Sequence, residues 1–231
     1  IIPNSVTSIG ERAFHGCTLK SVVIPDSITS IADHTFSSSS IESVVIPDSV
    51  TSIGNWAFKE NHIKSINIPD SVTFIGRGNF YRCFNLQSVV IPDGVTTIEV
   101  GLFHHCTSLK SVVIPDSVTS IKKSAFRDCT SLESIIIPKS VTFIEKQVFE
   151  LCTSLKSIVI PEGVPYIGEY MFADCESLES IVIPESVTSI NKNAFDGCTS
   201  LKTINFLGTR NQWKELKLKL DGNIIVKCSD E

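Results

Sequence analysis

The residues with the strongest potential for chemistry are eight cysteines and five histidines. Cysteine thiols form disulfides, bind metal ions or act as nucleophiles, and histidines serve as metal ligands and general bases. His104, His105 and Cys106 are consecutive and look like a set of metal ligands. Serine and aspartate are also abundant enough to complete a Ser–His–Asp triad by count alone. The spacing of these residues must therefore decide between the possibilities.

The cysteine spacing argues against a fixed disulfide framework. Seven cysteines form one periodic series: Cys17, Cys83, Cys106, Cys129, Cys152, Cys175 and Cys198. Ser39 and Asn61 occupy the two positions of the series that lack cysteine, so any fixed scheme of disulfides between units leaves some cysteines without a partner. There is no Cys-x-x-Cys spacing of the kind that structural zinc sites use. We predict a column of buried thiols that act as small hydrophobic side chains, with disulfides between neighbouring units or a metal site as alternatives.

The histidines give no catalytic constellation. His104 occupies the position that His15 and Arg127 hold elsewhere in the series, which predicts a variable, solvated surface position. No Gly-x-Ser-x-Gly elbow and no glycine-rich phosphate loop is present. The sequence therefore predicts no catalytic residues, no bound metal, no cofactor and a protein that is not an enzyme.

The chain is an internal repeat of 22–23 residues. Two independent series carry this period. The prolines are Pro3, Pro25, Pro47, Pro69, Pro92, Pro115, Pro138, Pro161 and Pro184. The phenylalanines are Phe14, Phe36, Phe58, Phe80, Phe103, Phe126, Phe149, Phe172 and Phe195. Units of this length that open with Leu-x-x-Val-x-Ile have the length and spacing of leucine-rich repeats, which stack because one unit cannot bury its apolar face alone.

Each unit is predicted to contain two extended segments and a turn. In the unit that begins at Leu109, the β-branched residues 111–114 form a strand that Pro115 ends. Residues 118–121 form a second extended piece, and residues 122–129 are predicted to form one helical turn.

Side-chain alternation predicts which residues face the core. Val112 and Ile114 belong to columns that are always apolar, so they point inward, together with Ala125 and Phe126 of the turn. Val113 lies between the first two and must point outward. These features predict an α/β repeat solenoid: a right-handed leucine-rich-repeat horseshoe with a concave parallel sheet, short second strands and one-turn helices on the convex side.

The units are similar to the BspA-like class of leucine-rich repeats, whose pattern is Leu-x-x-Ile-x-Ile-Pro-x-Ser-Val-x-x-Ile-Gly-x-x-Ala-Phe-x-x-Cys. Residues 208–213, with sequence Gly-Thr-Arg-Asn-Gln-Trp, and the strand-like residues 224–228 resemble the ending of that family. The resemblance implies a secreted or cell-surface protein of a bacterium or protist that binds host or neighbour-cell proteins, and it brings no catalytic residues.

The ends of the chain follow from the repeat. Residues 1–206 are predicted to form the array and residues 207–231 a capping segment. In that segment, residues 211–218 are expected to form a short amphipathic helix whose Trp213 and Leu216 cover the last open strand edge. The chain begins within a strand pattern, which predicts a piece of a longer array.

Three columns of exposed residues are candidates for recognition. The first is the outward strand column: Val23, Val45, Asn67, Val90, Val113, Ile136, Val159, Val182 and Asn205. It is either an apolar contact stripe or simple β-propensity on a sheet face. The second follows the prolines: Asp26, Asp48, Asp70, Asp93, Asp116, Lys139, Glu162 and Glu185. It either caps turns or binds a cation or a basic partner.

The third column is aromatic, where Phe74, Phe143 and Tyr166 replace the usual serine as contact points or as packing between neighbouring units. We select these partner-binding residues: Val90, Val113, Ile136, Val159, Val182, Phe143 and Tyr166. The predicted function is a non-enzymatic protein-binding module, secreted or at the cell surface, for host or extracellular-matrix proteins. The alternative is a structural spacer that displays another domain of a longer protein.

Composition excludes two classes of partner. The net charge of -5 and the scattered lysines and arginines leave no basic footprint for nucleic acid. The longest apolar runs are only a few residues, as at residues 135–137, whereas a bilayer span needs roughly 20. The sequence thus predicts no nucleic-acid partner and no membrane span.

Overall fold

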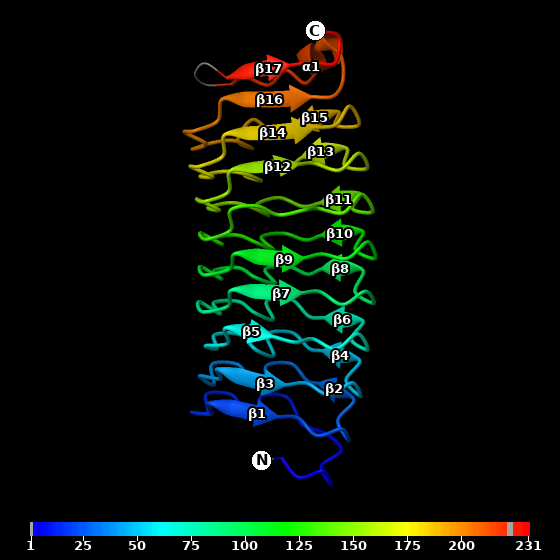
Figure 1. The fold of residues 1–231 in the computed structure, drawn as a ribbon, viewed down its shortest axis with the longest axis vertical. Helices are drawn as coiled ribbons and strands as arrows, with labels where there is room; N and C mark the ends of the chain where they lie inside the picture. Colours follow the sequence, from blue (N-terminus) through cyan, green and yellow to red (C-terminus); the bar gives the residue numbers. More distant parts are fainter. Residues whose placement is uncertain (1, 221–223) are drawn as a thin grey trace.

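The chain folds as a stack of similar coils, seen in the computed structural model, which describes residues 2–220 and 224–231 (Figure 1). The coils follow one another as a nearly straight column in the view of Figure 1. The predicted parallel-strand solenoid is therefore confirmed. The curvature and the right-handed winding of a horseshoe stay predictions.

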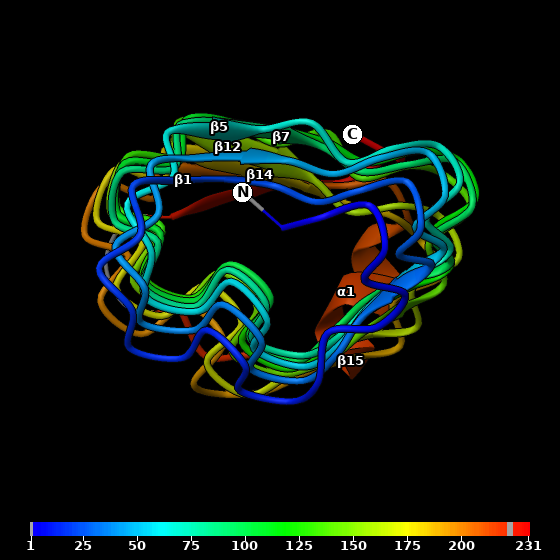
Figure 2. The ribbon, with the colours of Figure 1, turned by 90° about the horizontal axis from the view of Figure 1, so that it is seen from below.

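Most coils contribute two short strands, as the alternation predicts. The first strands are β1 (Ser21–Val23), β3 (Ser43–Val45), β5 (Ser65–Ile66), β7 (Ser88–Val90), β9 (Ser111–Val113), β12 (Ser157–Val159), β14 (Ser180–Ile183) and β16 (Thr203–Phe206). The second strands are β2 (Ser30–Ile31), β4 (Ser52–Ile53), β6 (Phe74–Ile75), β8 (Thr97–Ile98), β10 (Ser120–Ile121), β11 (Phe143–Ile144), β13 (Tyr166–Ile167) and β15 (Ser189–Ile190). Figure 2 shows the first strands on one side of the coil and the second strand β15 on another.

The strands form several short parallel sheets, and within each sheet a residue pairs with its equivalent one unit along the chain. Val89 lies beside Val112 and Val90 beside Val113 between β7 and β9. Val112 is 8% exposed and Val113 is 57% exposed, so the predicted inward and outward columns are confirmed. Residues 134–136 are not in a strand, and the first-strand ladder is interrupted there.

A column of stacked phenylalanine rings fills the core. Phe126 is fully buried, and its ring centroid lies 5.4 Å from that of Phe103 and 5.6 Å from that of Phe149. The same near-parallel stacking links every neighbouring pair from Phe14 to Phe195. Because the repeat fixes one ring above the next, these rings form an unbroken core along the column axis.

The predicted one-turn helices are wrong. In residues 122–129 three successive turns form instead, with hydrogen bonds from Ala125 N to Lys122 O, from Arg127 N to Ser124 O and from Cys129 N to Phe126 O. The alternate amides donate to the next coil, as Phe126 N does to Val148 O at 3.0 Å. A helix directs all its amides along its own axis, so it could not supply these bonds between coils.

Most coils have two residues with a positive φ in these turns. In this coil they are Ser124, at 57°, and Asp128, at 59°. Other coils place bulky side chains at these positions, such as Trp56 at 51° and Tyr170 at 53°. This left-handed conformation is costly for a side chain with a Cβ, so the hydrogen bonds between coils must outweigh it.

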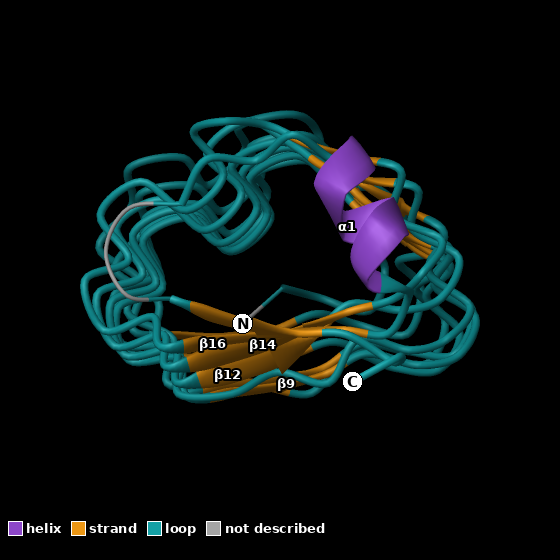
Figure 3. Cartoon of the chain, turned by 90° about the horizontal axis from the view of Figure 1, so that it is seen from above, coloured by secondary structure: helices purple, strands orange, loops and turns teal. Residues whose placement is uncertain are grey.

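The C-terminal segment closes the stack with a helix and a strand. Helix α1 (Arg210–Glu215) begins with a capping box between Thr209 and Gln212, and its Trp213 ring lies 5.4 Å from that of Phe206. Strand β17 (Ile225–Lys227) pairs with β16. The edge of β16 is thus covered by β17, whereas the helix lies over the second-strand side at the same end of the column (Figure 3). Among the described residues no helix has the length and hydropathy of a bilayer span.

Replacing Phe126 with alanine should lower the free energy of unfolding by about 3–5 kcal/mol, because it opens a cavity and breaks the ring column. Phe84→Ala is the matched control, since Phe84 is 48% exposed. Denaturant unfolding followed by circular dichroism measures both. Equal losses of stability in the two variants would contradict a continuous core of stacked rings.

Candidate protein-binding face

An exposed apolar stripe runs along the face of the first strands. Val90 is 61% exposed, Ile136 is 85% exposed and Val159 is 59% exposed, whereas Val182 is half-buried. Their inward neighbours anchor the strands in the core, so the outward side chains are held at fixed positions one coil apart. We call this surface the first-strand face, with Val23, Val45, Val90, Val113, Ile136 and Val159 as its exposed apolar stripe.

One border of the stripe is a ladder of alternating charges that our sequence analysis missed. It consists of Lys20, Glu42, Lys64, Gln87, Lys110, Glu133, Lys156, Glu179 and Lys202. The ammonium of Lys20 lies 2.6 Å from Glu42, and that of Lys156 lies 2.6 Å from Glu133. These contacts hold the pKa of the Glu42 and Glu133 carboxyls below the ordinary value. The signal was present in the sequence as opposite charges at the repeat spacing.

The other border is the acidic row, which begins at Asp26, Asp48, Asp70, Asp93 and Asp116 and is fully exposed. The turn-capping interpretation does not hold, because the turn forms identically without a carboxylate. The Val118 amide donates to Pro115 O at 3.1 Å beside Asp116, and Val141 donates to Pro138 O at 3.1 Å beside Lys139.

Serine hydroxyls, not the aspartates, tie these turns to the preceding coil. Ser117 Oγ donates to Val95 O at 2.8 Å, and Ser140 Oγ donates to Val118 O at 2.7 Å. Within the described chain the aspartates of the row form neither an ion pair nor a side-chain hydrogen bond. Like charges roughly 5 Å apart in water repel by about 1 kcal/mol before screening by salt, so the row carries an unrelieved electrostatic cost.

Phe143 and Tyr166 lie on a different face from the valine stripe. They belong to the second strands β11 and β13, and Figure 2 shows that the second strands lie away from the first-strand face. Their rings meet edge to face with centroids 6.1 Å apart, and the Lys122 ammonium lies 4.8 Å from the Phe143 centroid. The structure therefore does not join the predicted site residues into one surface, and packing between neighbouring coils accounts for this pair.

A shallow groove of about 580 Å³ adjoins this aromatic pair, with Glu145, Lys146 and Asn191 among its lining residues. Burial raises the pKa of the Tyr166 hydroxyl, and the Glu145 carboxylate adds to the effect. Three charged side chains of the groove already have partners, since Lys146 pairs with Glu169 at 3.1 Å and Glu145 pairs with Lys122 at 3.8 Å. The shallow groove therefore offers few free charged groups to direct a ligand.

The histidine pair is more buried than the sequence predicts. The His104 ring stacks on that of His105 with centroids 4.3 Å apart. The Tyr81 ring lies nearly perpendicular to the His104 ring, with centroids 5.1 Å apart. Burial, aided by His105, Arg127 and Arg82, lowers the pKa of His104 to about 4. His105 Nδ1 contacts the Asp128 carboxylate. Among the described residues no group of three His, Cys, Asp or Glu side chains could hold a metal ion.

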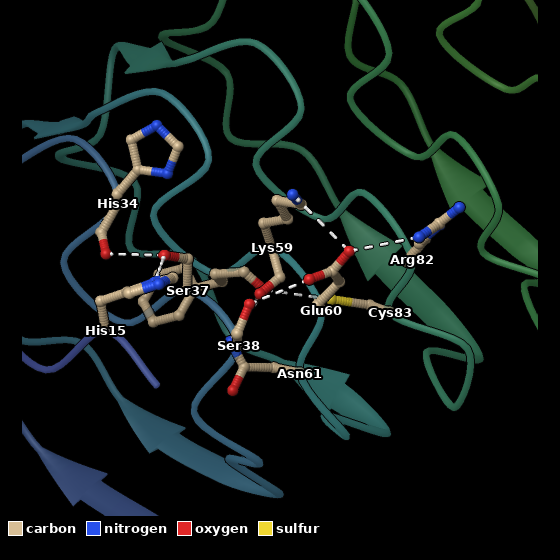
Figure 4. Close-up of polar contacts among 10 residues, drawn as sticks. His15, His34, Ser37, Ser38, Lys59, Glu60, Asn61, Arg82 and Cys83 are labelled. Atoms are coloured by element: carbon tan, nitrogen blue, oxygen red, sulfur yellow. Dashed lines mark hydrogen bonds and ion pairs between the residues drawn. The ribbon is translucent and has the colours of Figure 1, made fainter. Parts of the chain in front are cut away.

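A polar cluster on the turn side holds neighbouring coils together (Figure 4). Glu60 accepts a hydrogen bond from Ser38 Oγ at 2.9 Å and pairs with Arg82 at 3.5 Å in the next coil. His15 Nδ1 lies 2.7 Å from Ser37 Oγ, a contact between a histidine ring and a serine hydroxyl (Figure 4). That hydroxyl donates its proton to His34 O at 3.0 Å, so the pair lacks the free proton that a nucleophilic serine gives to its base.

The cysteine column supplies hydrogen-bond donors to the phenylalanine column. Cys129 Sγ donates to Phe103 O at 3.2 Å, and Cys152 Sγ donates to Phe126 O at 3.1 Å. Cys83, Cys106, Cys175 and Cys198 repeat the contact. The predicted burial is confirmed for the five central thiols of the column, whereas Cys17 and Cys198 at its two ends are half-buried, and all eight cysteines are free.

The same contact explains the two departures from cysteine in that column. Ser39 Oγ donates to Phe14 O, and Asn61 Nδ2 donates to Phe36 O at 2.8 Å. Asn61 Oδ1 also accepts from the Ile41 amide at 2.8 Å. The position thus requires a small donor, and cysteine is the most apolar residue that provides one.

The fold is a leucine-rich-repeat solenoid, because parallel strands stack in coils of 22–23 residues around an apolar core and leave one face of outward side chains. Proteins with this fold generally bind other proteins and are generally non-enzymatic. Residues 1–110 and 96–216 match the BspA type leucine-rich-repeat region, in six copies. The chain belongs to this family. None of the curated proteins matches it.

Solved structures of bacterial leucine-rich-repeat proteins share the fold. A leucine-rich-repeat protein from Bacteroides ovatus is 35% identical with a TM-score of 0.83, over 89% of this chain and 54% of that one. The chain thus spans about half of that relative. A leucine-rich cell-surface protein from Faecalibacterium prausnitzii is 38% identical with a TM-score of 0.61, over 94% and 67%. The pneumococcal vaccine antigen PcpA, at 19% identity, TM-score 0.55, and 98% and 72% coverage, shares the fold alone.

Cys129→Ala should be less stable than Cys129→Ser by about 1–3 kcal/mol, because alanine leaves the buried Phe103 carbonyl without its donor. The free energy of unfolding in urea, measured for both variants, tests this. Burial raises the pKa of the Cys129 thiol well above its ordinary value, so the native thiol should also resist alkylation at pH 8. Equal stability of the two variants would contradict the donor role.

His104 should make the protein less stable as the pH falls from about 6.5 to about 4. Over that window the unfolded chain binds a proton at this histidine, whereas the folded protein does not. His104→Gln should therefore reduce the change in urea midpoint between pH 7 and pH 4.5, and His62→Gln, at an exposed position, should not. Identical pH dependence in the two variants would contradict the buried environment.

Proposed function

We propose that this chain is a non-enzymatic protein-binding module that contacts its partner through the first-strand face. The observation that carries the proposal is the stripe of outward valines and isoleucine, with side chains 53–85% exposed. An apolar stripe on a rigid, regular face is typical of an interaction surface. Phe143 and Tyr166 are assigned to a separate face.

The stripe supplies a useful share of binding energy because its side chains are already ordered. Full burial of a valine contributes roughly 1.5–3 kcal/mol, so each stripe valine, a little over half exposed, contributes about 1 kcal/mol. Several such contacts amount to about 4–6 kcal/mol, the scale of a weak interaction. The backbone is fixed by bonds between coils, so binding orders little of this chain.

We further propose that the protein acts at the cell surface or after secretion, in adhesion to host or extracellular-matrix proteins. Support comes from the family and from the cell-surface description of the Faecalibacterium relative. The structural spacer is the alternative, and the same experiment separates the two.

Binding of the purified chain to a panel of extracellular-matrix and serum proteins tests the proposal. The variant Val90→Thr/Val113→Thr/Ile136→Thr keeps the β-branch and the charge but removes apolar surface. It should weaken any saturable interaction at least tenfold, with an unchanged circular-dichroism spectrum and melting temperature. The lysine version of the triple variant should abolish binding.

The matched control places three equivalent changes elsewhere, at Phe74, Phe84 and Val100, which are 40–48% exposed on other parts of the coil. Each becomes threonine, and the affinity should stay unchanged. If the control weakens binding as much as the stripe variant, the face assignment is wrong. If no protein of the panel binds, the spacer function is favoured instead.

A further inference from the structure

We propose that the partner of the first-strand face is a basic, extended protein segment that lays apolar side chains on the stripe and cationic side chains on the acidic row. This inference rests on the proposed function and names the chemistry of its partner. The acidic row consists of Asp26, Asp48, Asp70, Asp93, Asp116, Lys139, Glu162 and Glu185.

The first argument is that several other columns place opposite charges on neighbouring coils. On the far border of the stripe, Lys20 faces Glu42 at 2.6 Å. On the turn side, Arg127 faces Glu150 at 3.1 Å and Lys146 faces Glu169 at 3.1 Å. In the acidic row, five consecutive coils instead place aspartate beside aspartate, without a cation among them. The stack thus tolerates a longer run of like charges in this row than in the columns of Lys20, Arg127 and Lys146.

The second argument is that the fold does not require these carboxylates. The Pro–Asp–Ser–Val turn keeps the same hydrogen bond when lysine replaces the acid at position 139. The neighbouring serines, and not the aspartates, bond to the preceding coil, as Ser27 Oγ does to Val6 O at 2.6 Å. The row is thus a surface feature that is free to meet an external partner.

The third argument is position. Asp116 follows Val113 by three residues, so the row runs parallel to the stripe at a separation of about 10 Å. Lysine and arginine side chains are long enough to reach the row from a segment lying over the valines. The opposite border mixes lysines with glutamates and one glutamine, so the acidic row is the edge of the face that attracts cations. Because the five consecutive aspartates lie at one end of the acidic row, the negative electrostatic potential is strongest over the coils that contain Asp26 to Asp116.

The experiment uses two labelled peptides of 16 residues, one alternating lysine and valine and the other alternating glutamate and valine. Fluorescence anisotropy measures their binding to the purified chain at 50 and 200 mM NaCl. The basic peptide should bind and should weaken at least fivefold in the higher salt. The acidic peptide should not bind.

Two variants of equal net charge separate the row from overall charge. The row variant is Asp26→Asn/Asp48→Asn/Asp70→Asn/Asp93→Asn/Asp116→Asn. The control changes exposed carboxylates outside the row: Glu11→Gln/Asp174→Asn/Glu176→Gln/Asp196→Asn/Glu215→Gln. The row variant should weaken binding of the basic peptide at least tenfold, and the control less than twofold. Equal losses, or no loss in the row variant, would overturn the inference.

Two further outcomes keep the inference distinct from the proposed function. Calorimetric titration with calcium chloride tests the row as a cation site, and saturable binding that the row variant abolishes would replace the basic segment with a divalent ion. A panel protein whose binding depends on the Val→Thr changes but not on the Asp→Asn changes would uphold the binding face and overturn the basic partner. Threonine changes should also weaken the basic peptide, since the valines form half of its contact.

Discussion

The hydrogen bonds between one coil and the next are the constraint on which the rest of the structure depends. In the turn region alternate amides donate to the following coil, as Ser124, Phe126 and Asp128 do. This pattern can form only if every coil follows the same backbone path. It therefore forbids a helix in residues 122–129 and imposes a positive φ on two residues in most coils, whatever their side chains.

Because the coils share one backbone path, equivalent residues of successive coils lie directly beside one another. Each column of equivalent side chains must therefore tolerate contact with its own residue type. Phenylalanine stacks favourably on phenylalanine, and cysteine supplies a donor to the carbonyl of the preceding phenylalanine. Charged columns solve the problem by alternating sign, as Lys20 and Glu42 do. The acidic row departs furthest from this pattern, with five aspartates in succession, and we therefore interpret it as a recognition surface and not as a structural element.

The same constraint produces a surface suited to recognition. Hydrogen bonds between coils and the buried residues of each strand hold the backbone rigid. An outward side chain such as that of Val113 therefore has a fixed position but makes no contribution to the core. Recognition by such a face changes little in the protein itself. Specificity then depends on which side chains fill the outward columns, and here these are an apolar stripe with one acidic border.

The sequence by itself determined the repeat, the two strands per coil and the sides on which Val112, Val113 and Phe126 lie, because period and alternation are local properties of the chain. It also indicated the buried thiols and the outward stripe. Only the tertiary structure decided the turn conformation, the burial of His104 and the separation of Phe143 and Tyr166 from the stripe. These features arise from contacts between residues 22 or 23 positions apart and from the closure of the coil, and no local pattern encodes them.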